Sequence, residues 1–401
     1  MTQAIDAIAP ARPSHMRIVG AVSAAHFVSH YYILLLAPLM PFVREEYGVS
    51  YTEIGLAFAA FNIVSALLQT PAGFLVDRLG ARTLLIAGIL IGAVAFAVAG
   101  LVHSFWVLVA MFGLAGIGNT VYHPADYALL SHHVPSERIG QAFSVHTFAG
   151  MLGSAVTPPA VLAMQAMWGW RGAMIGSAVL GLAAAAVLML TTEPEAARPV
   201  RHKSDADRTD WQVLLSAPVL LNLGFFVLLA MISSGLYNYS VVAFGALFAT
   251  PVETANAALT GNLLLTAIGV LAGGLLVGRT RRHGLVASIG LAVSAAFTLL
   301  FAEVDLGTFA LIAAMSAAGF ASGIIMPSRD MIVRAVTPAG SFGKVFGFVT
   351  TGFNIGGIVA PLIFGAIMDH GSPRLVFLTV AALTLAAILT VATRPGRPAA
   401  E

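Results

Sequence analysis

Apolar runs long enough to cross a membrane alternate with short polar breaks along the chain. A transmembrane helix needs roughly 20 mostly apolar residues, and Gly, Pro and charged residues mark the breaks. This pattern predicts six spans near residues 18–42, 52–75, 83–102, 105–130, 140–164 and 170–191. A second set follows near residues 217–245, 256–278, 284–303, 307–331, 342–367 and 373–393. The sequence therefore predicts an all-α membrane protein with twelve transmembrane helices.

One long polar stretch, from Glu193 to Asp210, separates the two sets of spans. We expect an N-terminal six-helix bundle at residues 1–192, a cytoplasmic central loop at 193–212 and a C-terminal six-helix bundle at 213–401. The halves also repeat at a constant offset of 203 residues, which pairs Gly116 with Gly319, Pro124 with Pro327, Gly153 with Gly356, Pro158 with Pro361 and Arg171 with Arg374. Two parallel repeats predict a transporter that works by alternating access, with its substrate site between the halves.

Composition narrows the classes of function further. Hydrophobic residues make up 58% of the chain and charged residues 9%, whereas about 25% of a soluble domain is charged. The 20 basic and 18 acidic residues nearly balance, which argues against a nucleic-acid partner. Cysteine is absent, which excludes disulfides and thiolate chemistry. Without a phosphate-binding loop or a nucleophile motif, we predict neither an enzyme nor a cofactor.

The distribution of basic residues predicts the orientation in the membrane. If both termini are cytoplasmic, 16 of the 20 Lys and Arg residues fall inside, three fall outside (Arg44, Arg171 and Arg374), and Arg329 lies within a span. Cytoplasmic loops carry the excess of Lys and Arg in membrane proteins. We therefore expect a multi-pass protein of a bacterial inner membrane, with both termini cytoplasmic and the lipid bilayer as its surroundings.

A loop motif follows the second predicted span. It places Gly73, Asp77, Arg78, Gly80 and Arg82 in the order G-x-x-x-D-R-x-G-x-R. This segment resembles the loop motif of the major facilitator superfamily, and the resemblance implies the fold of that family. We expect Asp77 to pair with cations and with the start of a helix at residues 341–343, which would lock the cytoplasmic side. The corresponding loop of the second half has Gly278 in place of the Asp, so the lock is expected to be asymmetric.

Ionisable and amide groups inside the spans are the candidate substrate and proton pathway, because such groups are costly in a membrane. They are His26 and His30 of the first span, Asn119, His123 and Asp126 of the fourth, His146 of the fifth, and Arg329 and Asp330 of the tenth. Asp126 and His123 could carry protons, or the carboxylate could form a structural hydrogen bond. Arg329 could pair with Asp126 to seal the cytoplasmic side, bind an anionic substrate, or pair with its neighbour Asp330.

Two further patterns leave alternatives open. His26 and His30 stand one helical turn apart and could chelate a divalent cation, with His123 and His146 joining them. The pair has no carboxylate near it in the sequence, so we predict no metal ligands and no catalytic residues. Ser233, Ser234 and Gly235, followed by residues 237–239, predict a loosened stretch of the seventh span that could form an external gate or an aromatic lining.

A narrower resemblance rests on the first, fourth and fifth spans. The runs 116–124, 140–144 and 150–154, together with residues 26–30, are similar to exporters of the fosmidomycin-resistance type. This resemblance implies proton-coupled efflux of a small organic, possibly anionic, compound or drug. Uptake of an organic or inorganic anion is the alternative, and export of a divalent metal through a His-lined path is a third. We expect the partners to be a small-molecule substrate and protons, and the protein to be a monomer.

Overall fold

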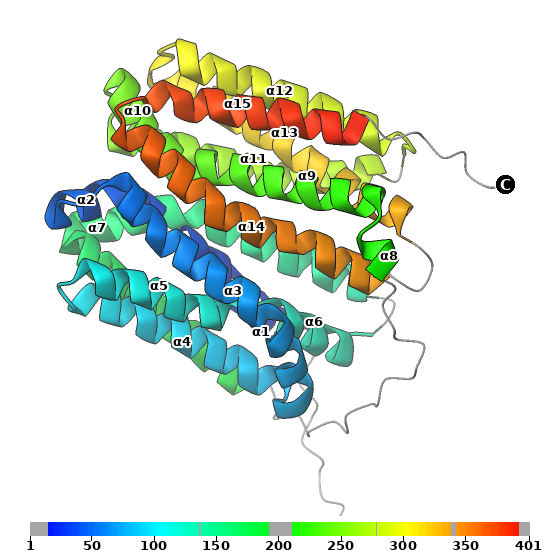
Figure 1. The fold of residues 1–401 in the computed structure, drawn as a ribbon. Coiled ribbons are helices and arrows are strands. Elements are labelled where there is room, and N and C mark those ends of the chain that lie inside the picture. Colours follow the sequence, from blue (N-terminus) through cyan, green and yellow to red (C-terminus); the bar gives the residue numbers. More distant parts are fainter. Residues whose placement is uncertain (1–14, 136–137, 192–210, 278, 338–341, 393–401) are drawn as a thin grey trace, which may run out of the picture.

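The computed structural model describes residues 15–135, 138–191, 211–277, 279–337 and 342–392. Most of the predicted central loop and residues 338–341 lie outside these ranges. The described chain is helical throughout and forms two bundles that lie side by side (Figure 1).

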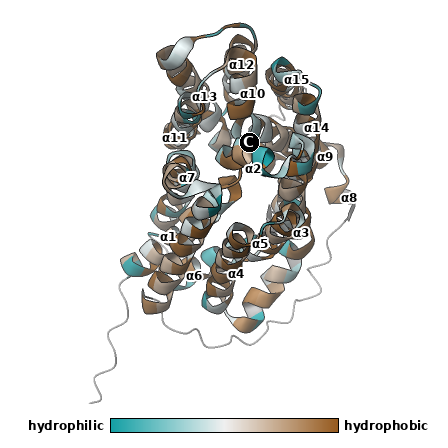
Figure 2. Ribbon diagram, turned by 90° about the vertical axis from the view of Figure 1, so that its left-hand side faces the viewer, coloured by the Kyte–Doolittle hydropathy of each residue, from teal (hydrophilic) through white to brown (hydrophobic). Residues whose placement is uncertain are grey.

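The first bundle consists of α1 (His15–Leu34), the short η1 (Ala37–Leu39), α2 (Met40–Tyr47), α3 (Tyr51–Leu79), α4 (Ala81–Leu101), α5 (Phe105–Asn119), α6 (Tyr122–His133) and α7 (Ile139–Thr191). The second consists of α8 (Trp211–Leu214), α9 (Ala217–Ser234), η3 (Gly235–Tyr239), α10 (Ser240–Phe248), α11 (Val252–Val277), α12 (His283–Glu303), α13 (Gly307–Val336), α14 (Phe342–Asp369) and α15 (Pro373–Ala392). Between the bundles, α3 packs against α14, and α7 against α11 (Figure 2).

Eleven segments of the described chain are long and apolar enough to cross a membrane. One of them, α7, holds two helices joined at Gly169, whose φ of 70° breaks the helical path. Glycine adopts this left-handed conformation without the steric cost that a Cβ would add. Counting α7 as two spans gives twelve, so the predicted all-α fold with twelve transmembrane helices is confirmed.

Two local breaks interrupt the long helices, one at the loosened stretch that the sequence predicted and one inside the predicted span 105–130. Residues Gly235–Tyr239 form a π-helical turn between α9 and α10, at the predicted loosened stretch. α5 ends at Asn119 and α6 begins at Tyr122. Pro124, in the first turn of α6, has no N–H to bond to the carbonyl of Thr120, which favours a break there.

Paired glycines show that the two bundles share one packing scheme. A Cβ on Gly153 of α7 would overlap the carbonyl oxygen of Phe27 on α1, and a Cβ on Gly356 of α14 would lie 2.6 Å from that of Val227 on α9. Gly153 and Gly356 are related by the offset of 203 residues. Small residues allow helix backbones to approach closely in a membrane. The sequence repeat is therefore also a repeat of helix contacts.

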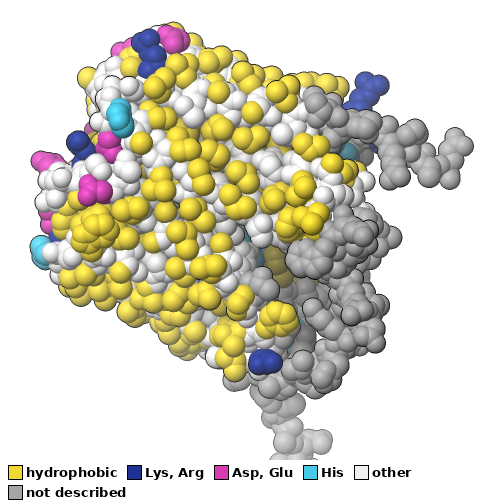
Figure 3. Space-filling view, in the orientation of Figure 1, with side chains coloured by type: hydrophobic (Ala, Val, Ile, Leu, Met, Phe, Trp, Pro, Cys, Tyr) yellow, Lys and Arg dark blue, Asp and Glu magenta, His cyan; other side chains and the backbone are white. Residues whose placement is uncertain are grey.

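The molecular surface has an apolar middle and a polar edge (Figure 3). We call the distal side the end at which α2, α4, α10, α12 and α14 finish, and the terminus side the end at which α1 begins and α15 finishes. Charged side chains gather at the distal edge, while apolar side chains cover the long face between the two sides. A contiguous apolar surface of this kind suits contact with lipid rather than water.

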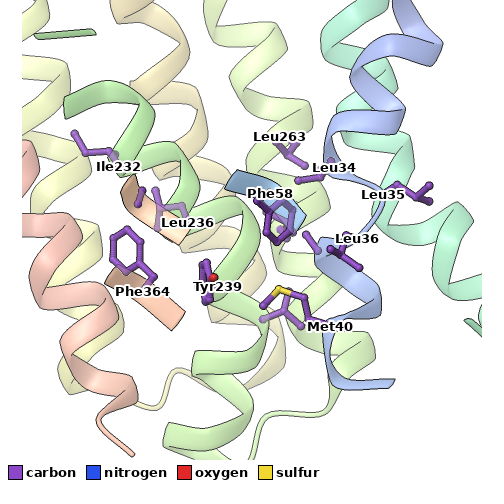
Figure 4. Close-up of a cluster of buried hydrophobic side chains, with 14 of the residues drawn as sticks. Leu34, Leu35, Leu36, Met40, Phe58, Ile232, Leu236, Tyr239, Leu263 and Phe364 are labelled. Atoms are coloured by element: carbon purple, nitrogen blue, oxygen red, sulfur yellow. The ribbon is translucent and has the colours of Figure 1, made fainter. Parts of the chain in front are cut away.

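On the distal side, a continuous apolar core joins the two bundles. Leu36, Met40 and Phe58 of the first bundle meet Leu236 and Tyr239 of the second (Figure 4). A second apolar cluster contains residues of α1, α3, α4, α6 and α7, all from the first bundle. The packing that closes the space between the bundles is therefore concentrated on the distal side.

A carboxylate from the second bundle reinforces this closure. Asp369, at the end of α14, accepts hydrogen bonds from the backbone N–H groups of Tyr51 (2.7 Å) and Thr52 (2.8 Å) and from the Thr52 hydroxyl (2.5 Å). These N–H groups belong to the first turn of α3, whose start has unpaired donors and a partial positive charge. We call this arrangement the Asp369 latch, because it binds α3 to α14 across the boundary between the bundles.

Candidate functional site

The predicted loop motif occupies the turn between α3 and α4. Gly80, with φ of 90°, separates the two helices and adopts a backbone conformation that favours glycine. Arg78 is exposed, and Arg82 donates a hydrogen bond to the Met189 carbonyl at 2.9 Å. The Asp77 side chain and residues 338–341 lie outside the described parts, so the lock between them stays a prediction.

Three titratable side chains from three helices meet inside the first bundle. The Asp126 Oδ2 atom of α6 lies 3.3 Å from His26 Nδ1 of α1 and 3.6 Å from His146 Nε2 of α7. Asp126 is 0% exposed, His146 1% and His26 4%. The imidazoles stack with their ring centres 3.8 Å apart. We call these three residues the buried triad.

Two more imidazoles border the triad. The rings of His30 and His123 lie 4.7 and 5.3 Å from that of His26. His30 Nδ1 lies 3.3 Å from the Ser154 hydroxyl, and His123 is exposed. Gly150 of α7 makes room for the rings, because a Cβ there would lie 2.7 Å from His26 Nε2. The sequence indicates all four histidines as candidate pathway residues, whereas Gly150 and Ser154 enter only through the narrower resemblance.

The polar atoms of the triad have few hydrogen bonds. Both oxygens of Asp126, Nδ1 of His26 and both ring nitrogens of His146 are buried and lack a well-aligned hydrogen-bond partner among the described residues. The hydroxyl of Tyr122, on the same helix as Asp126, is also buried and has no hydrogen-bond partner among the described residues. Buried polar groups are satisfied in the great majority of cases. So many at one place indicate a site that accepts a proton, a water molecule or an ion.

Asn119 belongs to a different contact. Its side-chain nitrogen donates to the Ser65 hydroxyl of α3 at 3.4 Å, and that hydroxyl donates to the Gly116 carbonyl at 3.1 Å. This arrangement connects α5 to α3, as interhelical amides commonly do. The structure thus places Asn119 away from the triad's carboxylate, although the two share one sequence pattern.

In the second bundle, Arg329 pairs with its neighbour. Its Nε and Nη2 atoms both lie 2.8 Å from Asp330 Oδ1. The guanidinium carbon also lies 4.8 and 5.5 Å from the ring centres of Phe226 and Phe353, a cation–π arrangement. In this conformation no ion pair between Arg329 and Asp126 is seen in the described chain. The inter-bundle seal considered from the sequence is not formed here.

A cavity of about 90 Å³ adjoins Arg329. Its lining comes from α9, η3, α11, α12, α13 and α14 and includes Tyr237, Asn262, Ser294 and Phe353. A cationic guanidinium beside hydroxyl and amide groups can recognise a carboxylate, sulfonate or phosphonate. This cavity is the most suitable place for a small anion that we find in the described chain.

Exposed side chains lie on the terminus side of the apolar closure. Tyr127 of α6 is 46% exposed, and its ring lies 5.9 Å from that of His146. The Asp330 side chain, which pairs with Arg329, is 45% exposed. Both residues therefore border accessible space on that side, and we call this space the chamber.

Comparisons with known proteins agree with the helical fold. The model of the Major Facilitator Superfamily matches residues 22–253 and 223–401. The chain belongs to this superfamily. It is 27% identical to the fosmidomycin resistance protein of Escherichia coli (strain K12), covering 93% of this chain and 92% of that protein. It is also 27% identical to a probable sulfoacetate transporter of Cupriavidus necator, covering 92% and 91%.

A solved structure shows the same fold. A bacterial homologue of the human lysosomal transporter Spinster, in an inward-facing and occupied conformation, aligns with a TM-score of 0.77 at 14% identity, covering 95% of this chain and 97% of that one. The expected superfamily and the resemblance to fosmidomycin-resistance proteins are therefore confirmed. The protein is a membrane transporter of a small solute, and not an enzyme.

Proposed function

We propose that this protein exports a small organic anion from the cytoplasm across the bacterial inner membrane in exchange for protons. The observation that carries the proposal is the buried triad: a carboxyl group with no exposed surface, held between two imidazoles and close to the chamber. Because one chain supplies both the buried triad and the cavity beside Arg329, we propose that the monomer is the working unit.

The proton part of the proposal follows from the surroundings of Asp126. Burial disfavours the charged form of a carboxyl group, and an imidazole gains or loses a proton near neutral pH. The titratable groups that surround Asp126 are His26 and His30 from α1, Tyr122, His123 and Tyr127 from α6, and His146 from α7. Rocking of the bundles changes the access of water to this group, and with it the proton occupancy.

The anion part rests on the cavity beside Arg329. The guanidinium keeps donors available, since only Nε and Nη2 bond to Asp330 in the described chain. Two relatives that align along nearly the whole chain are named for fosmidomycin and sulfoacetate, which are small compounds with phosphonate and sulfonate groups. We infer a substrate of similar size and charge.

The orientation of the chain supports the proposed direction. Arg17, Arg78, Arg82, Arg138 and Arg279 all lie at the terminus side, which favours a cytoplasmic location for that side. The chamber then opens to the cytoplasm in this conformation and is closed by the distal core and the Asp369 latch. A compound inside the cell could enter it directly.

Everted membrane vesicles provide the test. Respiration acidifies their interior, and a pH-sensitive dye reports protons that leave when sulfoacetate or fosmidomycin is added outside. We expect proton release with wild-type protein and none with Asp126→Asn at equal expression. Arg334→Gln, an exposed position on the same helix as Arg329, is the matched control and should behave as wild type.

The sign of the response separates the alternatives. Solute uptake into these vesicles with proton release is the expected result of export. If solute instead enters right-side-out vesicles together with protons, the protein is an importer and the proposed direction is wrong. Solute transport with the same pH dependence in wild type and Asp126→Asn would contradict proton coupling through the triad.

A further inference from the structure

The buried triad has the donor set of a transition-metal site. Imidazole nitrogen and carboxylate oxygen are common ligands of Zn²⁺, with bonds of about 2.0–2.2 Å. Two ligand atoms at such distances from a tetrahedral ion lie about 3.3–3.5 Å apart. His26 Nδ1 and His146 Nε2 lie 3.3 and 3.6 Å from Asp126 Oδ2, close to that separation. All three ligand atoms lie within 4.8 Å of one another.

The unsatisfied atoms point to a ligand independently of these distances. Nδ1 of His26, Nε2 of His146 and both oxygens of Asp126 lack well-aligned hydrogen bonds among the described residues, although each residue is more than nine-tenths buried. Groups that merely stabilised the helix packing would be expected to bond to one another or to the backbone. A cation at their centre would satisfy them all at once.

The surroundings allow a metal ion to arrive and to complete its coordination. His30 and His123 lie next to His26, and His123 is exposed, so an ion can approach the triad from this side. Gly150 leaves the space that the imidazoles occupy. Three protein ligands leave a fourth position for water or for one of these neighbouring imidazoles. The carboxylate that the His26–His30 pair lacks in its own helix is supplied by Asp126 of α6.

We propose that His26, Asp126 and His146 bind a divalent transition-metal ion such as Zn²⁺, and that the bound ion blocks transport because it occupies the side chains on which the proposed function depends. The ion would also tie α1, α6 and α7 together within the first bundle. Only the inhibitory part of this proposal rests on the proposed function.

Direct binding tests the site without any transport. Purified full-length protein without a polyhistidine tag is titrated with Co²⁺, whose visible absorption reports ligand number and geometry, and Zn²⁺ is then added in competition. We expect one ion per chain and displacement of Co²⁺ by Zn²⁺. His146→Gln should weaken binding at least tenfold, and Asp126→Asn similarly. His133→Gln, whose ring bonds to the Leu129 carbonyl at the end of α6, is the matched control.

Failure of the metal site, of its blocking role and of the proposed function would each give a different result. Absence of a stoichiometric ion in folded wild-type protein, or equal affinity in wild type and His146→Gln, overturns the metal site. Gel filtration and thermal unfolding confirm that each variant is folded, and His26→Gln replaces any that is not. If Zn²⁺ binds but does not inhibit proton-coupled transport, the blocking role is wrong. If Zn²⁺ binds and transport proves independent of protons, the site stands and the proposed function fails.

Discussion

The two bundles share one helix packing scheme, but their side chains differ in chemistry at equivalent positions. Gly153 and Gly356 make the same close helix contacts, whereas Asp126 and Arg329, also 203 residues apart, are a buried acid and a partly buried base. The acid is surrounded by imidazoles and the base by aromatic rings. The difference teaches that the repeat preserves packing while the chemistry diverges, and in our proposal the first bundle handles protons and the second binds the anion.

The largest expected effect comes from removing the acid. Asp126→Asn should lower solute transport driven by a pH gradient by roughly 100-fold or more, because the group that exchanges the proton is gone. Exchange of labelled for unlabelled solute across a membrane without a gradient should continue, since the Arg329 cavity is intact. Transport assays in proteoliposomes measure both. If a folded Asp126→Asn variant lost both gradient-driven transport and solute exchange, the proposed separation of proton and anion roles between the bundles would be contradicted.

Removing the base should have a different result. Arg329→Gln should weaken anion binding about 10- to 100-fold, the equivalent of a charge-assisted hydrogen bond worth about 1.5–3 kcal/mol. Binding of sulfoacetate to purified protein measures the change, with Arg334→Gln as the control. If Arg329→Gln bound sulfoacetate as tightly as wild type, Arg329 would not be part of the substrate site. The proposed anion-binding role of the second bundle would then be contradicted.

The shared helix packing can be tested by substituting its paired glycines. Gly153→Ala and Gly356→Ala should each lower the free energy of unfolding by about 1–3 kcal/mol, because the new Cβ would press on a helix backbone. Gly140→Ala on α7 and Gly347→Ala on α14 meet nothing within 4 Å and serve as controls. Thermal unfolding in detergent measures the stability of all four variants, and we expect the two paired-site variants to be less stable than the two controls. If only one of the two paired-site variants had a lower free energy of unfolding, the helix packing at the two sites would not be equivalent.

The smallest effect is expected at the Asp369 latch. Its repeat position in the first bundle is Ala166, so the latch is another asymmetry between the bundles. Asp369→Asn weakens an exposed charge-assisted contact by about 1 kcal/mol, which corresponds to roughly a five-fold shift toward distal opening. The chain has no Cys, so spin labels at Glu45→Cys and His370→Cys report the distance directly. An unchanged distance distribution would show that the apolar core alone keeps this side closed.

Much of the fold was predictable because membrane spans and repeats leave strong signals. Apolar length gave the twelve helices, and paired Gly and Pro residues gave the two related bundles. The choice of the histidines and Asp126 as candidate pathway residues followed from the cost of ionisable groups inside a span. The triad's close geometry did not, because the contact of Asp126 with His26 and His146 depends on how three helices pack. The space at Gly150 and the latch at Asp369 depend on distant neighbours too, and single-chain patterns do not encode such contacts.

The central claim is that Asp126 gives up a proton when the anion binds. The most direct measurement uses purified protein in weakly buffered detergent solution, with binding of sulfoacetate or fosmidomycin established first and proton release then followed with an indicator dye. We predict release of about one proton per bound anion from wild-type protein and none from Asp126→Asn that still binds. Equal release from both proteins, or saturating binding to wild type without release, would contradict the claim.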